Sequence, residues 1–278
     1  MPVYEFFLTS SLEKVFADQR PAALHTDRLN GLIGDRIAFQ LAYSVQKNTE
    51  PKPQEFTVEV SGIDVPIRLR DVVLMPSHYP VTEKQDGNYL RTEPGLYPDL
   101  LLPSSGRIIP VRNQFRSLWI DADLSGAKPG VYRLCVTIRT DETIMQELPL
   151  TVEVIDCALP EQELIHTEWF HTDCIADYYH VPVFSEQHWD SIEKFITAAA
   201  HDCGINMLLT PVFTPPLDTA VGGERTTVQL VSIARNGDAY SFDFTLLKRW
   251  CELCKKAGIT HLEIPPFLRN GELPLHRK

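Results

Sequence analysis

Apolar and polar residues alternate in short stretches through the first part of the chain, from Val3 to about Asp156. Such alternation places every second side chain on one face, as in a half-buried β-strand, and clusters of proline and glycine separate the stretches. The pattern predicts antiparallel strands packed as a β-sandwich domain over residues 1–157. The expected strands are Ile37 to Val45, Phe56 to Val60, Ile67 to Leu74, Phe115 to Ile120, Val131 to Thr137 and Leu148 to Ile155.

A stretch rich in proline, glycine and tyrosine, from Met75 to Pro110, interrupts this alternation. It predicts a long loop, and a long loop in a compact domain is often functional or packed against a neighbour. The loop contains an apolar run, Leu100 to Leu102. Because exposed apolar residues gain from burial, this run favours docking on the next domain over contact with a ligand.

The hydrophobic period changes after this domain, and residues 158–278 predict β/α units. Ser185 is placed to cap a helix whose apolar positions recur every three or four residues until Gly204. A second helix is expected from Phe244 to Ala257, ended by Gly258. The expected strands cover residues 165–170, 205–210 and 259–264, and the arms of an inserted β-hairpin cover residues 226–233 and 239–244.

Successive strand-helix-strand units of this kind build either a doubly wound sheet or a (β/α)8 barrel. Three strands close neither of them. We therefore expect an incomplete α/β barrel of about three strands and two helices. In both folds a site forms at the carboxyl ends of the strands, which makes the residues that follow each strand the candidates for binding.

Polar residues follow each of the three expected barrel strands. The candidate substrate-binding residues are His171, Asp173, Thr210, Asp218, Arg225, Gln229 and Glu263. Histidine, aspartate and glutamate side chains donate to or accept from sugar hydroxyls. Structural roles remain open: His171 and Asp173 could bond each other or the loop backbone, Asp218 could cap its loop, and Arg225 could pair with Glu224 or Asp218.

Aromatic residues are concentrated around the first barrel strand. They are Trp169, Phe170, Tyr178, Tyr179 and Trp189. One of them is a candidate for stacking on a sugar face, whereas most are expected in the core.

Charge and composition narrow the class of partner. With 278 residues, 44% of them hydrophobic, the chain is long enough for two ordinary domains with buried cores. A formal net charge of -11 without a dense basic run argues against binding to nucleic acid. No apolar run is long enough to span a bilayer, and the first residues lack the features of a signal peptide, so we expect a cytoplasmic protein that does not bind membranes.

Six cysteines are scattered through the chain, two of them as the pair Cys251 and Cys254. This pair falls inside the second expected helix and lacks a second pair of ligands at a suitable spacing. We expect most of the six cysteines to be reduced and buried, and this pair to be half-buried on its helix. We expect neither a disulfide framework nor a zinc site. The histidines show no metal spacing either, and no cofactor is expected.

Three motifs make the sequence resemble bacterial relatives of glycoside hydrolase family 123. They are Trp-Phe-His-Thr-Asp-Cys from Trp169, Leu-Thr-Pro-Val-Phe-Thr-Pro-Pro-Leu-Asp-Thr from Leu209, and Gly-Gly-Glu-Arg from Gly222. The resemblance implies a β-sandwich followed by a (β/α)8 barrel. It also implies a carbohydrate substrate, because the characterised family members are β-N-acetylgalactosaminidases.

The family mechanism implied by the resemblance is substrate-assisted and retaining. The acetamido group of the sugar attacks its own anomeric carbon, an aspartate orients that group, and an adjacent glutamate protonates the leaving oxygen. In the family this pair lies in a His-Ile-Ser-Asp-Glu-Pro motif, which the chain lacks. The one Asp-Glu dipeptide, Asp141-Glu142, falls between two expected sandwich strands and is typical of a solvated turn. We expect no catalytic residue in this chain.

The last residues, 265–278, depart from the family pattern Leu-Phe-Thr-Gln-Trp-Gly-Ala. One possible coding of that pattern, read one nucleotide late, gives the residues from Phe267 to Leu273. We therefore expect residues 265–278 to be a frameshifted tail and the chain to be a truncated, inactive glycoside hydrolase. The alternatives are a non-catalytic carbohydrate-binding or interaction module and a truncated product without activity. The sequence does not determine the oligomeric state.

Overall fold

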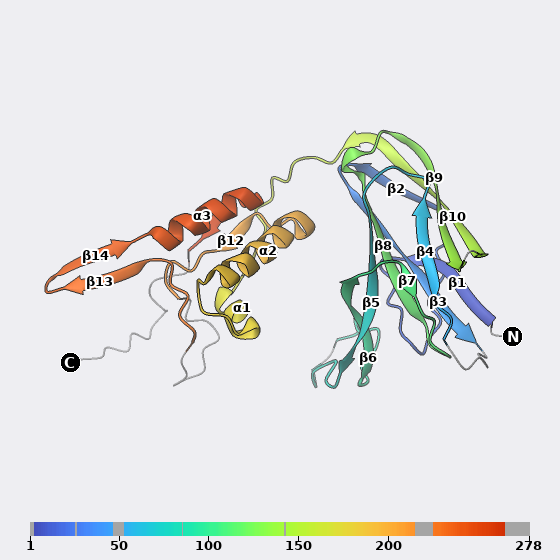
Figure 1. The fold of residues 1–278 in the computed structure, drawn as a ribbon, viewed down its shortest axis with the longest axis horizontal. Helices are drawn as coiled ribbons and strands as arrows, with labels where there is room; N and C mark the ends of the chain where they lie inside the picture. The colour runs from blue at the N-terminus through green and yellow to red at the C-terminus, as the bar shows by residue number, and fades with distance from the viewer. Residues whose placement is uncertain are drawn as a thin grey trace. The chain divides into compact units, whose positions relative to one another are not determined.

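The computed structural model describes residues 3–25, 27–46, 53–84, 86–141, 143–214 and 225–264. The chain divides into two compact units, residues 1–160 and 161–278. Figure 1 shows that the first is built from strands and that the second contains the α-helices. We call them the two-sheet unit and the β/α unit.

The two-sheet unit consists of two five-stranded sheets. Within the described residues of this unit, every pairing between named strands is antiparallel except that of β2 with β10. The first sheet has the order β1 (Val3–Ser10), β3 (Arg36–Gln46), β8 (Arg116–Asp123), β5 (Ile67–Ser77), β6 (Gly95–Pro103). The second has the order β2 (Arg28–Ile33), β10 (Thr143–Ala158), β9 (Gly130–Thr140), β4 (Phe56–Ser61), β7 (Arg107–Ile108). A short 3-10 turn, Leu124–Gly126, follows β8.

Apolar side chains from both sheets form one hydrophobic core. Phe39 of β3 and Ile120 of β8 come from the first sheet, and Phe56 of β4 and Val136 of β9 from the second. All four are at most 1% exposed. Burying side chains of this size stabilises the fold by about 1.5–3 kcal/mol each. The alternation along the sequence therefore predicts the faces of these strands correctly.

The expected long loop from Met75 to Pro110 is wrong over part of its length. Strand β5 continues to Ser77 and pairs with β6, and β7 follows. Strand β6 is the edge of its sheet, where a proline such as Pro98 is tolerated because one side of the strand needs no hydrogen-bond donor. The apolar run Leu100 to Leu102 lies in β6 and is 37–45% exposed, so its docking remains a prediction.

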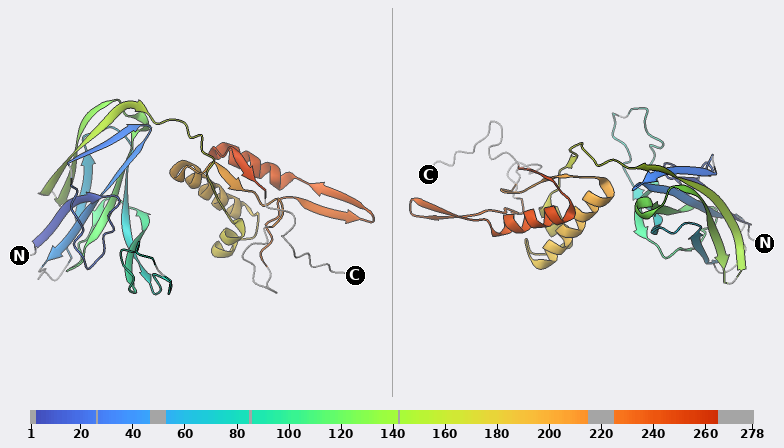
Figure 2. Two further views of the ribbon diagram at one scale, coloured as in Figure 1. Left: turned by 180° about the vertical axis from the view of Figure 1, so that it is seen from behind. Right: turned by 90° about the horizontal axis from the view of Figure 1, so that it is seen from above.

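The β/α unit contains a sheet of three short parallel strands. Their order is β11 (Thr167–Glu168), β12 (Met207–Leu209), β15 (His261–Glu263). The helices are α1 (Thr172–Tyr179), α2 (Glu186–Cys203) and α3 (Thr245–Ala257), and a hairpin is formed by β13 (Ser232–Asn236) and β14 (Ala239–Asp243). The described strands do not close into a barrel. Figure 2 shows the hairpin projecting away from the helices, and all of its residues are exposed.

The two predicted helices begin and end as expected. The side chain of Ser185 accepts a hydrogen bond from the backbone N–H of His188 at the start of α2. Gly204 and Gly258 end α2 and α3 in the left-handed conformation, with φ of 66° and 89°, which favours glycine. Their apolar faces, with Trp189, Trp250 and other residues, form the second core.

Helix α1 and the start of the hairpin differ from expectation. Helix α1 lacks the usual signals, since its N-cap His171 makes no side-chain cap bond and His180 takes the left-handed C-cap position. The first hairpin arm begins at residue 232 instead of 226. The preceding residues bond another segment: the N–H groups of Leu230 and Val231 donate to the carbonyls of Pro211 and Val212.

Candidate functional site

The carboxyl ends of β11, β12 and β15 meet at one edge of the parallel sheet. Thr167 lies opposite Met207, which lies opposite His261, and Leu209 lies opposite Glu263. Leu208 points to the opposite face, where it joins the core that contains residues of α2 and α3. The residues around Glu263 therefore lie on the face of the sheet that these helices do not cover.

Glu263 holds an exposed tryptophan at this edge. The indole Nε1 of Trp169 lies 3.2 Å from both carboxylate oxygens of Glu263, and the hydroxyl of Thr167 donates to Oε2 at 3.3 Å. Trp169 is 55% exposed. We call Thr167, Trp169 and Glu263 the strand-end cluster. The carboxylate fixes the edge of the indole, so that much of the ring is presented to solvent.

Asp173 and Arg225 form a bidentate ion pair. The Nε of Arg225 donates to Oδ2 of Asp173 at 2.5 Å and its Nη2 to Oδ1 at 3.0 Å. The Asp173 and Arg225 side chains are 5% and 14% exposed. Next to them, the hydroxyl of Thr226 donates to Asp177 at 2.8 Å. These contacts join α1 to the segment before the hairpin, and Asp173 and Arg225 are 52 residues apart in sequence. The two hydrogen bonds to one carboxylate match the planar geometry of the guanidinium.

Two polar atoms beside this ion pair are buried without a partner. They are Nδ1 of His171 and Oγ1 of Thr172, which have no hydrogen bond in the part of the chain that the structure describes. Thr172 is 1% exposed. A buried polar atom without a partner is costly, and such atoms often mark a place where a ligand or water binds.

The remaining candidates make internal contacts or lie elsewhere. Thr210 is 1% exposed; its hydroxyl donates to the Leu208 carbonyl and accepts from Nε1 of Trp250, both at 3.2 Å. It therefore positions a core tryptophan. The side chain of Gln229 donates to the Val231 carbonyl at 2.6 Å and is half-buried. Asp218 lies outside the described residues.

His188 is fully buried, although its sequence context indicates a surface or capping histidine. Its Nδ1 accepts from the N–H of Phe184 at 2.9 Å, so Nε2 carries the proton and donates to the Thr172 carbonyl at 2.9 Å. The ring thereby connects α2 to the start of α1. Its position three residues after the capping Ser185 gives no signal of this role, which depends on tertiary contacts.

Among the residues described, no group of three or more histidine, cysteine or acidic side chains could hold a metal ion. In the same residues no helix is long and apolar enough to cross a membrane.

The thiol of Cys254 is expected to resist alkylation in the folded chain, whereas the exposed Cys251 reacts. Burial first, and Cys251 second, raise the pKa of Cys254 to about 12, so its thiolate, the reactive form, is scarce at pH 8. Iodoacetamide labelling at pH 8 followed by peptide mass spectrometry measures both sites, and a sample in urea shows that Cys254 is reactive once unfolded. Equal labelling of the two cysteines in the folded chain would contradict this expectation.

Two comparisons relate the chain to a known family and to a known fold. The family model for the catalytic domain of glycoside hydrolase 123 matches residues 169–270. The chain is similar in structure to a family 123 glycoside hydrolase from Clostridium perfringens, studied for glycolipid glycan hydrolysis, with a TM-score of 0.69 and 16% identity. The match covers 94% of this chain and 48% of that one, so the chain spans about half the length of that structure. At this identity the likeness shows the fold alone.

The N-terminal domain of PorA also matches, with a TM-score of 0.23 and 9% identity over 55% of this chain and 100% of that one. A score this low carries no argument about the present fold. A search of the curated proteins found no match. The resemblance to glycoside hydrolase family 123 is nevertheless confirmed: residues 169–270 match its catalytic domain, and the chain has the fold of the matching half of a family 123 enzyme.

Proposed function

We propose that the chain is part of a glycoside hydrolase-like protein for N-acetylgalactosaminide linkages, in which the β/α unit provides one rim of the sugar site. In this proposal the two-sheet unit is a β-sandwich accessory domain, and residues 161–264 are the first part of a (β/α)8 barrel. The observation that carries it is the strand-end cluster: a half-exposed indole is held by a carboxylate at the carboxyl ends of parallel strands.

The chemistry of this rim suits a sugar. The face of Trp169 can stack on the apolar face of a pyranose ring, while the carboxylate of Glu263 can accept from ring hydroxyls. The buried Nδ1 of His171 has no hydrogen bond within the described residues, so it can form one with the sugar. The Asp173–Arg225 ion pair positions the segment at residue 225 beside α1. The two side chains bond each other, so the proposal gives them no contact with the sugar.

The catalytic step requires more than this rim. A substrate-assisted retaining reaction needs one carboxylate to orient the acetamido group and one carboxylic acid to protonate the leaving oxygen. The sequence has one Asp-Glu dipeptide, at residues 141–142, and Asp141 lies in a turn of the two-sheet unit with φ of 48°. We therefore propose that residues 1–278 bind the sugar without hydrolysing it.

The chain is expected to show no turnover of an aryl N-acetylgalactosaminide and to bind N-acetylgalactosamine weakly, as measured by saturation-transfer NMR. Trp169→Ala is expected to weaken this binding about tenfold, because it removes the stacking surface. Tyr178→Ala is the control, since Tyr178 is a 78% exposed aromatic residue of α1 outside the cluster. Measurable turnover, or sugar binding that Trp169→Ala leaves unchanged, would refute the proposal.

A further inference from the structure

The two-sheet unit contains a cavity of about 650 Å³ at the ends of β5 and β6. Its walls come from three places: the segment that follows β1, the end of β5, and the connection between β5 and β6 with the start of β6. Ligand-binding pockets in proteins have volumes of about 300–1,000 Å³. The cavity is therefore large enough for a small ligand or for a few units of a chain-like one.

Two aromatic residues that line the cavity, Phe16 and Tyr97, are in contact with each other. The guanidinium of Arg91 lies 4.0 Å from the ring centre of Phe16, and Tyr97 meets the same ring edge-on at 5.8 Å. Arg91 also donates to both carboxylate oxygens of Asp18, at 2.8 and 3.1 Å. The Tyr97 hydroxyl donates to the carbonyl of Glu93 at 2.5 Å. These contacts restrain the two rings in the absence of a ligand, and such restraint lowers the entropy cost of binding.

The rim of the cavity carries an exposed tyrosine and unpaired polar groups. Tyr89 is 46% exposed. Within the described part of the chain, the side chains of Lys14, Asn88 and Asp99, which also line the cavity, have no hydrogen bond or ion pair. The rim thus offers an ammonium group, an amide and a carboxylate around an aromatic surface.

We propose that this cavity is a saccharide-binding site of its own and that it takes a neutral oligosaccharide. Sugar rings have apolar faces that stack on aromatic side chains, and their hydroxyls pair with amide, carboxylate and ammonium groups. One cationic and one anionic group at the rim favour a neutral ligand over a charged one. An extended peptide would pair with the backbone of the edge strand β6 and would not need these side chains.

The test uses the full chain on an array of neutral oligosaccharides, followed by calorimetry with the oligosaccharide that binds best. Tyr89→Ala is expected to weaken that binding at least tenfold and Asn88→Ala severalfold, whereas Tyr89→Phe keeps it within twofold. Tyr79→Ala is the matched control, because Tyr79 belongs to the same connection, is 85% exposed and does not line the cavity. Trp169→Ala separates this site from the strand-end cluster and is expected to leave the binding unchanged.

Three results would overturn the proposal. One is the absence of binding to every oligosaccharide on the array. The second is binding that Tyr89→Ala does not change, and the third is binding that Trp169→Ala abolishes, since the ligand would then occupy the β/α unit. Melting temperatures of the variants close to that of the parent chain show that folding is intact, as expected for exposed positions. The outcome does not depend on whether the proposed hydrolase function is correct.

Discussion

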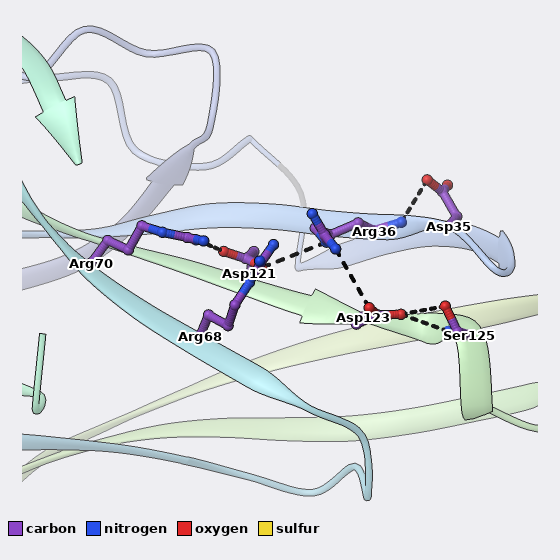
Figure 3. A network of polar contacts seen from close by, with 7 residues as sticks. All are labelled: Asp35, Arg36, Arg68, Arg70, Asp121, Asp123 and Ser125. Atoms are coloured by element: carbon purple, nitrogen blue, oxygen red, sulfur yellow. Dashed lines mark hydrogen bonds and ion pairs between the residues drawn. The ribbon is translucent and has the colours of Figure 1, made fainter. Parts of the chain in front are cut away.

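Replacing Asp121 by alanine is expected to lower the free energy of unfolding of the two-sheet unit by about 3 kcal/mol. Asp121 is 2% exposed and lies among three arginines on one face of the first sheet (Figure 3). The Nε of Arg68 lies 2.9 Å and that of Arg36 3.8 Å from its Oδ1, and Arg70 contacts its Oδ2. Without the Asp121 carboxylate, three guanidinium groups remain close together, and Asp123, which contacts Arg36 at 3.5 Å, balances only part of their charge.

The positions of these residues follow from strand register. Asp121 of β8 lies opposite Arg68 of β5 on one side and opposite Ala38 of β3 on the other. Arg36 of β3 lies opposite Asp123, two residues along the same face from Asp121. The arginines keep 21–37% of their side-chain surface exposed and can turn toward water, so we place the expected loss at the lower end of the range for broken buried pairs, about 3–5 kcal/mol.

Hydrogen exchange read by mass spectrometry measures this loss locally, in peptides from β5 and β8. Asp123→Asn is the matched control on the same strand, because Asp123 is about one-third exposed and is expected to cost about 1 kcal/mol. The Ser125 hydroxyl and N–H, then Arg36, lower the pKa of Asp123. Its stabilising effect is thus present above the usual aspartate pKa and is lost as the pH falls through the lowered value. Equal losses for Asp121→Ala and Asp123→Asn would contradict the special role of Asp121.

Replacing Arg225 by methionine is expected to lower the free energy of unfolding of the β/α unit by about 3 kcal/mol, because it leaves the Asp173 carboxylate buried and unpaired. Arg225→Lys keeps the charge but loses the bidentate hydrogen bonding, so we expect a smaller decrease in the free energy of unfolding than for Arg225→Met. Hydrogen exchange in peptides from α1 and from residues 225–231 measures the effect.

The double variant Arg225→Met with Asp173→Asn separates the ion pair from its context. It removes both charges, so much of the lost stability is expected to return, which the double-mutant cycle quantifies. Binding of N-acetylgalactosamine should remain within threefold of the parent value if the pair only positions its segment. A single Arg225→Met variant as stable as the parent would show that the ion pair does not hold these segments together.

Local patterns in the sequence predict much of the fold. Alternating apolar residues predict the core-facing sides of β3, β4 and β8, and the capping Ser185 with Gly204 predicts the ends of α2. These signals work because each depends on neighbours a few residues away. They fail for β6, because its prolines are typical of a loop and only its position at the sheet edge, which the sequence does not show, permits them in a strand. They also fail for α1, whose C-cap residue is His180 instead of a glycine.

The candidate site is predictable in its location but not in its contacts. Strand-helix-strand order places Glu263 and the residues after β11 at one edge of the sheet, as the structure confirms. The pairing of Asp173 with Arg225 and the burial of Thr210 against Trp250 depend on tertiary packing over 52 and 40 residues. No local pattern specifies such partners. Other residues of the same types, such as Glu224 and Asp218 for Arg225, are equally suitable partners when judged from the sequence.

The parallel pairing of β2 with β10 affects when the two-sheet unit can form during synthesis. Arg28 of β2 contacts Glu153 of β10, 125 residues later, and β10 also completes the second sheet by pairing with β9. Until β10 has left the ribosome, β2 has no neighbour in its sheet and its side of the core stays open to solvent. Contacts so distant in sequence slow folding. The unfinished unit thus exposes an unpaired sheet edge during translation, and it is at this stage that association with other chains or with chaperones is most favoured.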